Sequence, residues 1–184
     1  NFLTASKTII LNVVNALPII TTSPTTVINK TFGDLGFDIT ATSSSTGAFS
    51  FQVANSSVAS ITATGSVTIN GVGTTLITIT QAADANFLTA SKTITLNVVK
   101  ALPVITTSPT IINKIFGDLD FDITATSSST GTSSSTGAFS FQVANSSVAS
   151  VTATGSVTIN GVGTTSITIT QAADSNFLTA SKTI

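Results

Sequence analysis

The 184-residue chain contains no Cys, Met, Trp, Tyr, His, Arg or Glu, and its only charged side chains are six Lys and seven Asp. Without His, Cys or Glu the usual pairing of a nucleophile with a base is missing, so we expect no enzyme and no cofactor. The net charge of −1 argues against a nucleic-acid partner, because binding phosphates requires a basic face. No apolar run approaches the ~18 residues of a membrane-spanning helix, so we expect no membrane insertion.

The sequence instead contains a long internal repeat. The nine letters NFLTASKTI occur at residues 1–9, 86–94 and 176–184. Residues 1–85 align onto 86–175 with nine substitutions, one deletion and one six-residue insertion. The resulting period of 85 and then 90 residues exceeds the ~20 to 50 residues of solenoid repeats. Each copy is long enough to form its own core, so the chain is predicted to be a tandem array of domains.

Apolar and polar residues alternate along most of each copy, which is the pattern of half-buried strands. The alternating segments in and before the first copy are residues 8–13, 37–42, 49–54, 66–70 and 76–80. Turn-forming residues separate them, and no segment shows a helical period. Several short strands in about 85 residues predict an all-β chain of two-sheet sandwiches.

Substitutions between the copies indicate which strand face is buried, because a slip of one residue exchanges the two faces. Apolar exchanges at Ile61, Ile19 and Val27 (to Val151, Val104 and Ile111) predict that these three positions face inward. Exchanges of Ile10 for Thr95 and of Leu76 for Ser166 predict outward positions. The insertion converts SSSTG at Ser43–Gly47 into SSSTGTSSSTG at Ser127–Gly137, which predicts an exposed loop there.

The run FQVANSSVASITATGSVTINGVGTTLITITQAADANF and the preceding TFGDLGFDITATSSST resemble the bacterial immunoglobulin-like (group 2-like) tandem repeats of cell-surface and adhesin-type proteins. The shared pattern is an aromatic strand, an SSN-like turn, V-A-x-V, a hairpin ending in G-x-G-T-T and an I-T-I-T strand. The resemblance implies tandem immunoglobulin-like β-sandwich domains and specifies no ligand. Phe87 is a departure, since such repeats often carry Tyr there.

In this interpretation FLTASKTIILNVV is the last strand of a sandwich. Residues 1–15 are then the terminal strand of a preceding repeat, residues 16–100 are a complete repeat, and residues 101–184 are a second repeat lacking its last strand. The partners expected are copies of the chain itself or adjacent repeats in a longer chain. Two explanations remain open. The chain is a window of a longer array, or residues 1–15 complete a neighbouring molecule's sandwich by strand exchange, with Phe2, Leu3, Ile9, Leu11 and Val13 as the inter-subunit strand candidates.

One acidic cluster is a weak candidate for a calcium site. Asp118, Asp120 and Asp122 in GDLDFD have carboxylate oxygens, which suit Ca²⁺. However, spacing of two residues on a strand also describes an ordinary outward face, and the first copy has Gly36 in place of Asp120. We therefore expect no metal site and keep these three aspartates only as weak calcium candidates.

The sequence favours a structural module of an extracellular filament, stalk or adhesin shaft at the cell surface. The alternative is a binding module that recognises a carbohydrate, such as a surface glycan, or another surface ligand through the loop at residues 127–137. Its different length in the two copies argues mildly against a shared recognition site.

Overall fold

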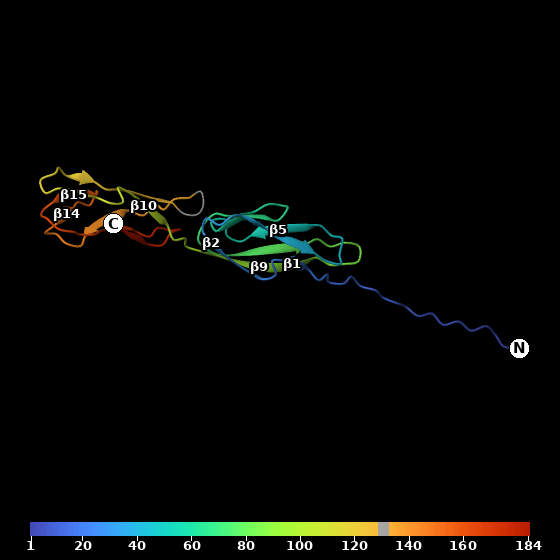
Figure 1. The fold of residues 1–184 in the computed structure, drawn as a ribbon. Helices are drawn as coiled ribbons and strands as arrows, with labels where there is room; N and C mark the ends of the chain where they lie inside the picture. The colour runs from blue at the N-terminus through green and yellow to red at the C-terminus, as the bar shows by residue number, and fades with distance from the viewer. Residues whose placement is uncertain (129–132) are drawn as a thin grey trace.

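Two strand-rich domains lie end to end in the computed structural model, which describes residues 1–128 and 133–184. No helix occurs among these residues, so the prediction of all-β tandem immunoglobulin-like sandwiches is confirmed. Accordingly, no described helix is long and apolar enough to cross a membrane. Residues 1–15 extend from the end of the molecule that faces away from the second domain, as Figure 1 shows.

The first domain contains nine strands. They are β1 (Thr21–Ser23), β2 (Val27–Thr31), β3 (Phe37–Asp38), β4 (Thr40–Thr42), β5 (Phe49–Val53), β6 (Ala59–Ile61), β7 (Ser66–Ile69), β8 (Gly73–Gln81) and β9 (Ala90–Val99). A four-stranded sheet has the order β2-β9-β8-β5, a three-stranded sheet has the order β3-β7-β6, and β1 pairs with β4. The strand β9 therefore has a partner on both sides, antiparallel to β8 and parallel to β2.

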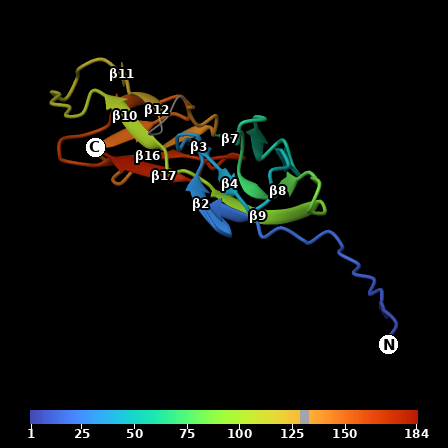
Figure 2. The same ribbon diagram turned by 90° about the vertical axis from the view of Figure 1, so that its right-hand side faces the viewer.

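The second domain repeats this plan with eight strands among the described residues. They are β10 (Val104–Ser108), β11 (Phe121–Asp122), β12 (Thr124–Ser128), β13 (Phe139–Val143), β14 (Ala149–Val151), β15 (Ser156–Ile159), β16 (Ile167–Gln171) and β17 (Ala180–Thr183). Of these, β16 and β17 are shorter than their equivalents β8 and β9. The sheets have the orders β13-β16-β17, β11-β15-β14 and β10-β12. Figure 2 shows β16 and β17 beside each other in this domain, as β8 and β9 are in the first.

Each domain has its own apolar core. In the first, Ile77, Ile79, Ile94 and Leu96 are fully buried, and the rings of Phe49 and Phe51 pack against them. The second core includes Ile123, Val157 and Ile169, which are the equivalents of Ile39, Val67 and Ile79 in the first. Alternation with a period of two explains this, because alternate residues of a strand face the same layer.

The predicted facing of the opening segments is wrong. Ile19 and Val27 are exposed, whereas their neighbours Ile20 and Ile28 lie in the core. These segments contain two adjacent apolar residues, so the sequence offers no alternation that would choose between them. The predicted positions of Ile61, which packs on the core, and of Leu76, which is exposed, are correct.

The predicted binding loop at residues 127–137 is only partly described. Residues 129–132 of this loop lie outside the described residues. Of the remainder, Ser135 and Thr136 donate hydrogen bonds to Asp174.

Candidate assembly site: the domain junction and the open groove

The second half of β9 forms a central part of the first domain. Leu96 is fully buried and Val98 is 3% exposed. Residues 95–99 lie in parallel register with β2, Val27 opposite Thr95 and Thr31 opposite Val99. On their other side residues 95–98 pair with the first half of β8, Gly73 opposite Val98. Burying a leucine or valine side chain contributes about 1.5–3 kcal/mol, so this half-strand is a major source of the domain's stability.

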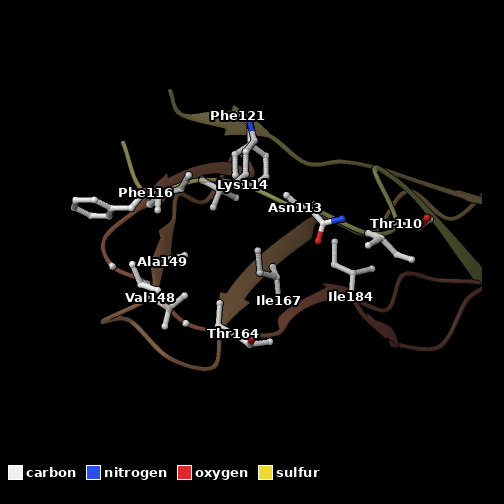
Figure 3. Close-up of a pocket in the computed structure, with 18 residues that line it drawn as sticks. Thr110, Asn113, Lys114, Phe116, Phe121, Val148, Ala149, Thr164, Ile167 and Ile184 are labelled. Carbon is white, nitrogen blue, oxygen red and sulfur yellow. The ribbon is translucent and has the colours of Figure 1, made fainter. Parts of the chain in front are cut away.

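The corresponding part of the second domain is an open groove. We use this name for the cavity of about 530 Å³ between residues 110–116 on one side and residues 161–167 with Ile184 on the other. In Figure 3, Asn113 and Lys114 line one side, and Thr164, Ile167 and Ile184 line the other. The strand β17 covers only the part of β16 from Thr168 to Gln171.

The walls of the open groove are the sequence equivalents of the two strands that hold β9. Residues 111–115 (IINKI) correspond to β2 (VINKT), and residues 163–166 (GTTS) correspond to the start of β8 (GTTL). Neither stretch is a strand in the second domain. The groove therefore has the composition of a β9-binding site, with backbone groups along both edges available for pairing.

The junction between the two domains is a second compact contact region. The rings of Phe32 and Phe177 meet edge to face, with centroids 5.5 Å apart and an interplanar angle of 86°. Such an aromatic pair contributes about 0.5–1.5 kcal/mol beyond its buried area. Phe177 is 2% exposed, whereas its equivalent in the first domain, Phe87, is only half-buried.

Hydrogen bonds surround this aromatic pair. The backbone N–H of Val72 in the first domain donates to the Asn176 side-chain oxygen at 3.2 Å. The Lys100 ammonium donates to the Asp174 carbonyl oxygen at 2.6 Å, a charge-assisted bond. Ala101, in the linker of residues 100–103 between β9 and β10, forms a β-bridge with Phe177. These contacts between the two domains, together with those of Lys100 and Ala101, restrict the orientation of one domain relative to the other.

An aspartate fixes the loop that carries the junction phenylalanine. Asp174 accepts the backbone N–H groups of Asn176 and Phe177 on one carboxylate oxygen, both at 2.8 Å. Its other oxygen accepts from Ser135 and Thr136. Burial by itself would raise the pKa of Asp174, but the backbone donors of these residues outweigh it and hold the pKa well below its usual range.

The first domain contains the same arrangement around Asp84. One oxygen accepts from the N–H groups of Asn86 and Phe87, and the other accepts from Ser45 and Thr46. The hydrogen bonds from Asn86 and then Thr46 hold the pKa of Asp84 well below its usual range. Both loops are therefore built to keep an ionised carboxylate at their centre.

The proposed inter-subunit strand candidates all lie in the exposed segment 1–15. These are Phe2, Leu3, Ile9, Leu11 and Val13, each at least 82% exposed. Their equivalents in β9 are different: Ile94, Leu96 and Val98 are buried in the first core. Residues 1–15 form no strand in the described chain, so their pairing with another molecule stays a prediction.

The three aspartates of the calcium candidate have separate local partners. Asp118 accepts the Ile115 N–H at 3.0 Å, and Asp120 accepts the Thr158 hydroxyl at 2.9 Å. Asp122 lies in β11 opposite Ser156. Within residues 1–128 and 133–184, no three acidic, histidine or cysteine residues are grouped so as to hold a metal ion.

Sequence reasoning missed the junction and the two aspartate-centred loops. Phe177 and Asn176 belong to the repeated nine letters, and the interpretation of these letters as a closing strand gives the two residues no role between domains. The signal available was the short run D-x-N-F, present at both 84–87 and 174–177. An aspartate two residues before Asn can accept that residue's N–H, which is a recognised turn pattern.

Comparison with known proteins assigns this sequence to a family. The model of the immunoglobulin-like domain of intimin matches residues 37–83 and 126–173, together just over half of the chain. This confirms the resemblance to bacterial immunoglobulin-like repeats. A search of curated protein sequences finds no match.

Solved structures similar to this chain include a protocadherin, an N-cadherin and a surface layer protein. Human protocadherin-24 EC1-2 is 12% identical with a TM-score of 0.40, over 92% of this chain and 95% of that one. Drosophila N-cadherin EC1-4 is 11% identical with a TM-score of 0.40, over 92% and 48%. The surface layer protein SbsC, domains 1-6, is 21% identical with a TM-score of 0.38, over 79% and 22%.

These structural similarities concern the fold alone, and the family assignment depends on the sequence match. That match occurs once in each domain, from the start of β3 to just past β8 and from within β12 to just past β16. The chain therefore belongs to the family of intimin immunoglobulin-like domains, of which it carries two in tandem.

Proposed function

We propose that the chain is a structural repeat module of an extracellular filament, stalk or adhesin shaft at the cell surface. The observation that carries this proposal is the domain junction. Phe32 against Phe177 and Val72 against Asn176 fasten two domains whose own cores are separate. The work done by such a module is geometric, so neither a catalytic residue nor a cofactor is required.

Because the junction restricts the angle between neighbouring domains, a tandem array of such domains has a defined length. A strand advances about 3.3 Å per residue, so the ten-residue β9 alone spans about 33 Å. Contacts on both sides of residues 100–103 restrict the angle between the domains. The lengths of successive domains therefore add along the chain, whereas the end-to-end distance of a flexible chain grows more slowly.

The proposed repeat boundaries follow the junction. We take residues 16–100 as one complete repeat and residues 101–184 as a second repeat in which β17 matches only the first half of the last strand β9. Residues 1–15 are then the last strand of a preceding repeat. Ala16 bridges Phe87 in the same way as Ala101 bridges Phe177, which supports starting both repeats at these alanines. Head-to-tail linkage through such boundaries arises within one longer chain or by donation of a strand between chains.

Replacing Phe177 by alanine tests the architectural role. We expect the variant to lose the fixed angle between the domains, because the aromatic contact with Phe32 disappears. The relative orientation is measured by residual dipolar couplings, and the maximum dimension by small-angle X-ray scattering. In the wild-type chain, one orientation should satisfy the couplings of both domains.

Phe87→Ala is the matched control for this experiment. Phe87 occupies the equivalent place in the first domain, bridged to Ala16, but no aromatic contact to another domain is described for it. This variant should show the same local loss of packing and an unchanged interdomain angle. A wild-type chain whose domains tumble independently would contradict the architectural proposal.

A further inference from the structure

We propose that the outer face of the sheet β2-β9-β8-β5 binds the same face of a second copy of this chain, side by side. This surface, called here the uncharged face, consists of alternate residues in 27–31, 50–52, 74–80 and 91–99, which point away from the core. The inference goes beyond the proposed function, which concerns domains joined end to end. It depends on that function only for the setting in which many copies lie next to one another.

No charged side chain belongs to the uncharged face. The two lysines of these four strands lie on the opposite side of the sheet. The Lys30 ammonium is 5.2 Å from the centroid of the Phe37 ring, and Lys92 donates to the Ile20 carbonyl oxygen at 3.4 Å. A charged partner would find no opposite charge here and would lose hydration without compensation. Two copies of this face, in contrast, do not repel each other.

An apolar row crosses the middle of the uncharged face. Val27, Thr95 and Leu76 lie directly opposite one another on three neighbouring strands. Val27 is 55% exposed and Leu76 is 47% exposed, and the methyl group of Thr95 lies between them. A solvent-facing side of a sheet normally carries polar residues. An apolar centre with a polar rim is the usual composition of a protein–protein interface.

Hydrogen-bonded polar rows lie on both sides of the apolar row. The Asn97 amide donates to the Asn29 side-chain oxygen at 3.1 Å and accepts from the Thr74 hydroxyl at 2.9 Å. Towards the other end of the strands, the hydroxyls of Thr80 and Ser91 are 3.0 Å apart. Because these groups already bond to one another, covering them costs less than covering groups that bond only to water.

A second copy fits the uncharged face because the face is complementary to itself. Hydroxyl and amide groups both donate and accept hydrogen bonds, and a two-fold axis brings the same surface of two molecules together. An axis along β9 at Thr95 would place Val27 of one copy against Leu76 of the other. A carbohydrate partner is less well matched, since Phe49 and Phe51 pack on the core and leave this face without an aromatic ring for a sugar to stack on.

The contact is small and therefore acts through repetition. Four strands give a face of about 15–20 Å by about 20–30 Å, which is smaller than an interface that holds two molecules together by itself. We expect weak association of separate chains. Where tandem domains of neighbouring shafts lie in parallel, many such contacts form together and the overall binding is stronger than that of a single contact.

The test measures self-association of the full chain by analytical ultracentrifugation and by NMR shifts over a range of concentrations. The wild-type chain should form dimers reversibly, with shift changes in the outward residues of β2, β9, β8 and β5. Leu76→Ser should weaken association by at least ~10-fold, because it removes an apolar side chain from the centre of the contact. Serine is tolerated in this sequence context, since Ser166 is the equivalent residue of the second copy.

A pair of charge variants tests the symmetry of the contact. Thr95→Lys should abolish dimers, because two like charges would meet at the axis. An equimolar mixture of Thr95→Lys and Thr95→Asp chains should restore them. Thr68→Lys is the matched control, since Thr68 is an exposed outward residue of β7 in the other sheet. It should leave association unchanged, and circular dichroism confirms that each variant is folded.

Three outcomes would overturn the proposal. The first is a wild-type chain that stays monomeric up to its solubility limit. The second is equal weakening by Thr68→Lys and Thr95→Lys, which would indicate a general effect of charge. The third is a shift of the same residues by a soluble neutral polysaccharide such as dextran without dimer formation, which would assign the face to carbohydrate binding.

Failure of this lateral contact is distinguishable from failure of the architectural role. The junction between β9 and β10 is intramolecular, so its orientation is measured on dilute monomers or on the Thr95→Lys variant. Monomers with a fixed interdomain angle would reject lateral association and leave the structural module intact. Dimers whose two domains tumble independently would do the reverse.

Discussion

The two domains differ in structure far more than in sequence. In the first, β8 has nine residues and β9 has ten, and β2 pairs along the outer edge of β9. In the second, β16 has five residues, β17 has four, and residues 111–115 form no strand. Nearly the same letters, GTTS for GTTL and IINKI for VINKT, thus adopt different structures. The lesson is that these stretches become strands only when a partner strand lies between them, because strand formation depends on pairing and packing more than on local propensity.

The largest expected effect comes from removing the side chain at the centre of that pairing. Leu96→Ala should destabilise the first domain by about 2–5 kcal/mol, because it leaves a cavity in a fully packed core. With no Trp or Tyr available, unfolding is followed by far-UV circular dichroism and calorimetry. Two transitions are expected, of which only the first domain's should shift.

Leu11→Ala is the matched control, since the same letter lies in an exposed segment. Its effect on unfolding of the monomer should stay within about 0.5 kcal/mol. Equal decreases in the free energy of unfolding for Leu11→Ala and Leu96→Ala would show that both side chains are packed in the monomer. That result would contradict the difference described here between the exposed segment 1–15 and β9.

The second prediction concerns the stability of both domains at acidic pH. The pKa values of Asp84 and Asp174 are lowered in the folded chain, so the ionised form is favoured by folding. The stability that results is present above the ordinary pKa of about 3.9 and is lost as the pH falls towards the lowered folded value. Asp84→Asn and Asp174→Asn should each flatten this part of the pH profile, measured by thermal unfolding between pH 7 and pH 2.

The aspartate variants also sharpen the comparison between the domains. The inserted residues in the second copy leave the hydrogen bonds of Asp174 to Thr136, Asn176 and Phe177 in place. We therefore expect similar flattening in both domains, but a loosened interdomain angle only for Asp174→Asn. A loosened angle in Asp84→Asn would contradict the assignment of the junction to the second loop.

The smallest effect is expected at a buried threonine whose environment differs between the copies. The Thr22 hydroxyl donates to the Thr25 carbonyl oxygen at 3.2 Å. The equivalent Thr107 is 5% exposed, and its hydroxyl has no hydrogen-bond partner among the described residues. The one-residue deletion beside Thr110 explains the difference, since it shortens the turn that supplies the acceptor.

Valine substitutions at Thr107 and Thr22 should consequently change the stability of their domains in opposite directions. Thr107→Val should stabilise the second domain by up to about 1 kcal/mol, whereas Thr22→Val should destabilise the first by about 0.5–1.5 kcal/mol. Calorimetric midpoints of the two transitions provide the measurement. Destabilisation by both substitutions would mean that the Thr107 hydroxyl is satisfied in solution.

The sequence predicted the fold well where its alternation was strict. Phe49, Phe51 and Val53 lie on one face of β5, and Ile77 and Ile79 of β8 are fully buried. The turns at Gly65 and at residues 70–73 also appear where Gly and Asn indicate them. The repeat itself helped, because two copies show which positions tolerate polar residues.

The parts that could not be predicted depend on contacts distant in sequence. Nothing local to Ile19 and Ile20 indicates which of the two enters the core, since both are apolar. The junction pair Phe32–Phe177 joins residues in different domains. Residues 111–115, beside the open groove, likewise carry a strand-forming sequence but pair with no strand among the described residues.

The parallel pairing of β2 with β9 has a mechanical consequence. Tension along the chain pulls β9 towards its end at Val99 and into the next domain, while the opposite pull reaches β2 through β1 and the Ala16 side. Two parallel strands drawn in opposite directions must slide past each other, so the rungs from Val27–Thr95 to Thr31–Val99 share the load together instead of opening one by one. A shaft of such domains would resist stretching at the strand that also links each unit to the next.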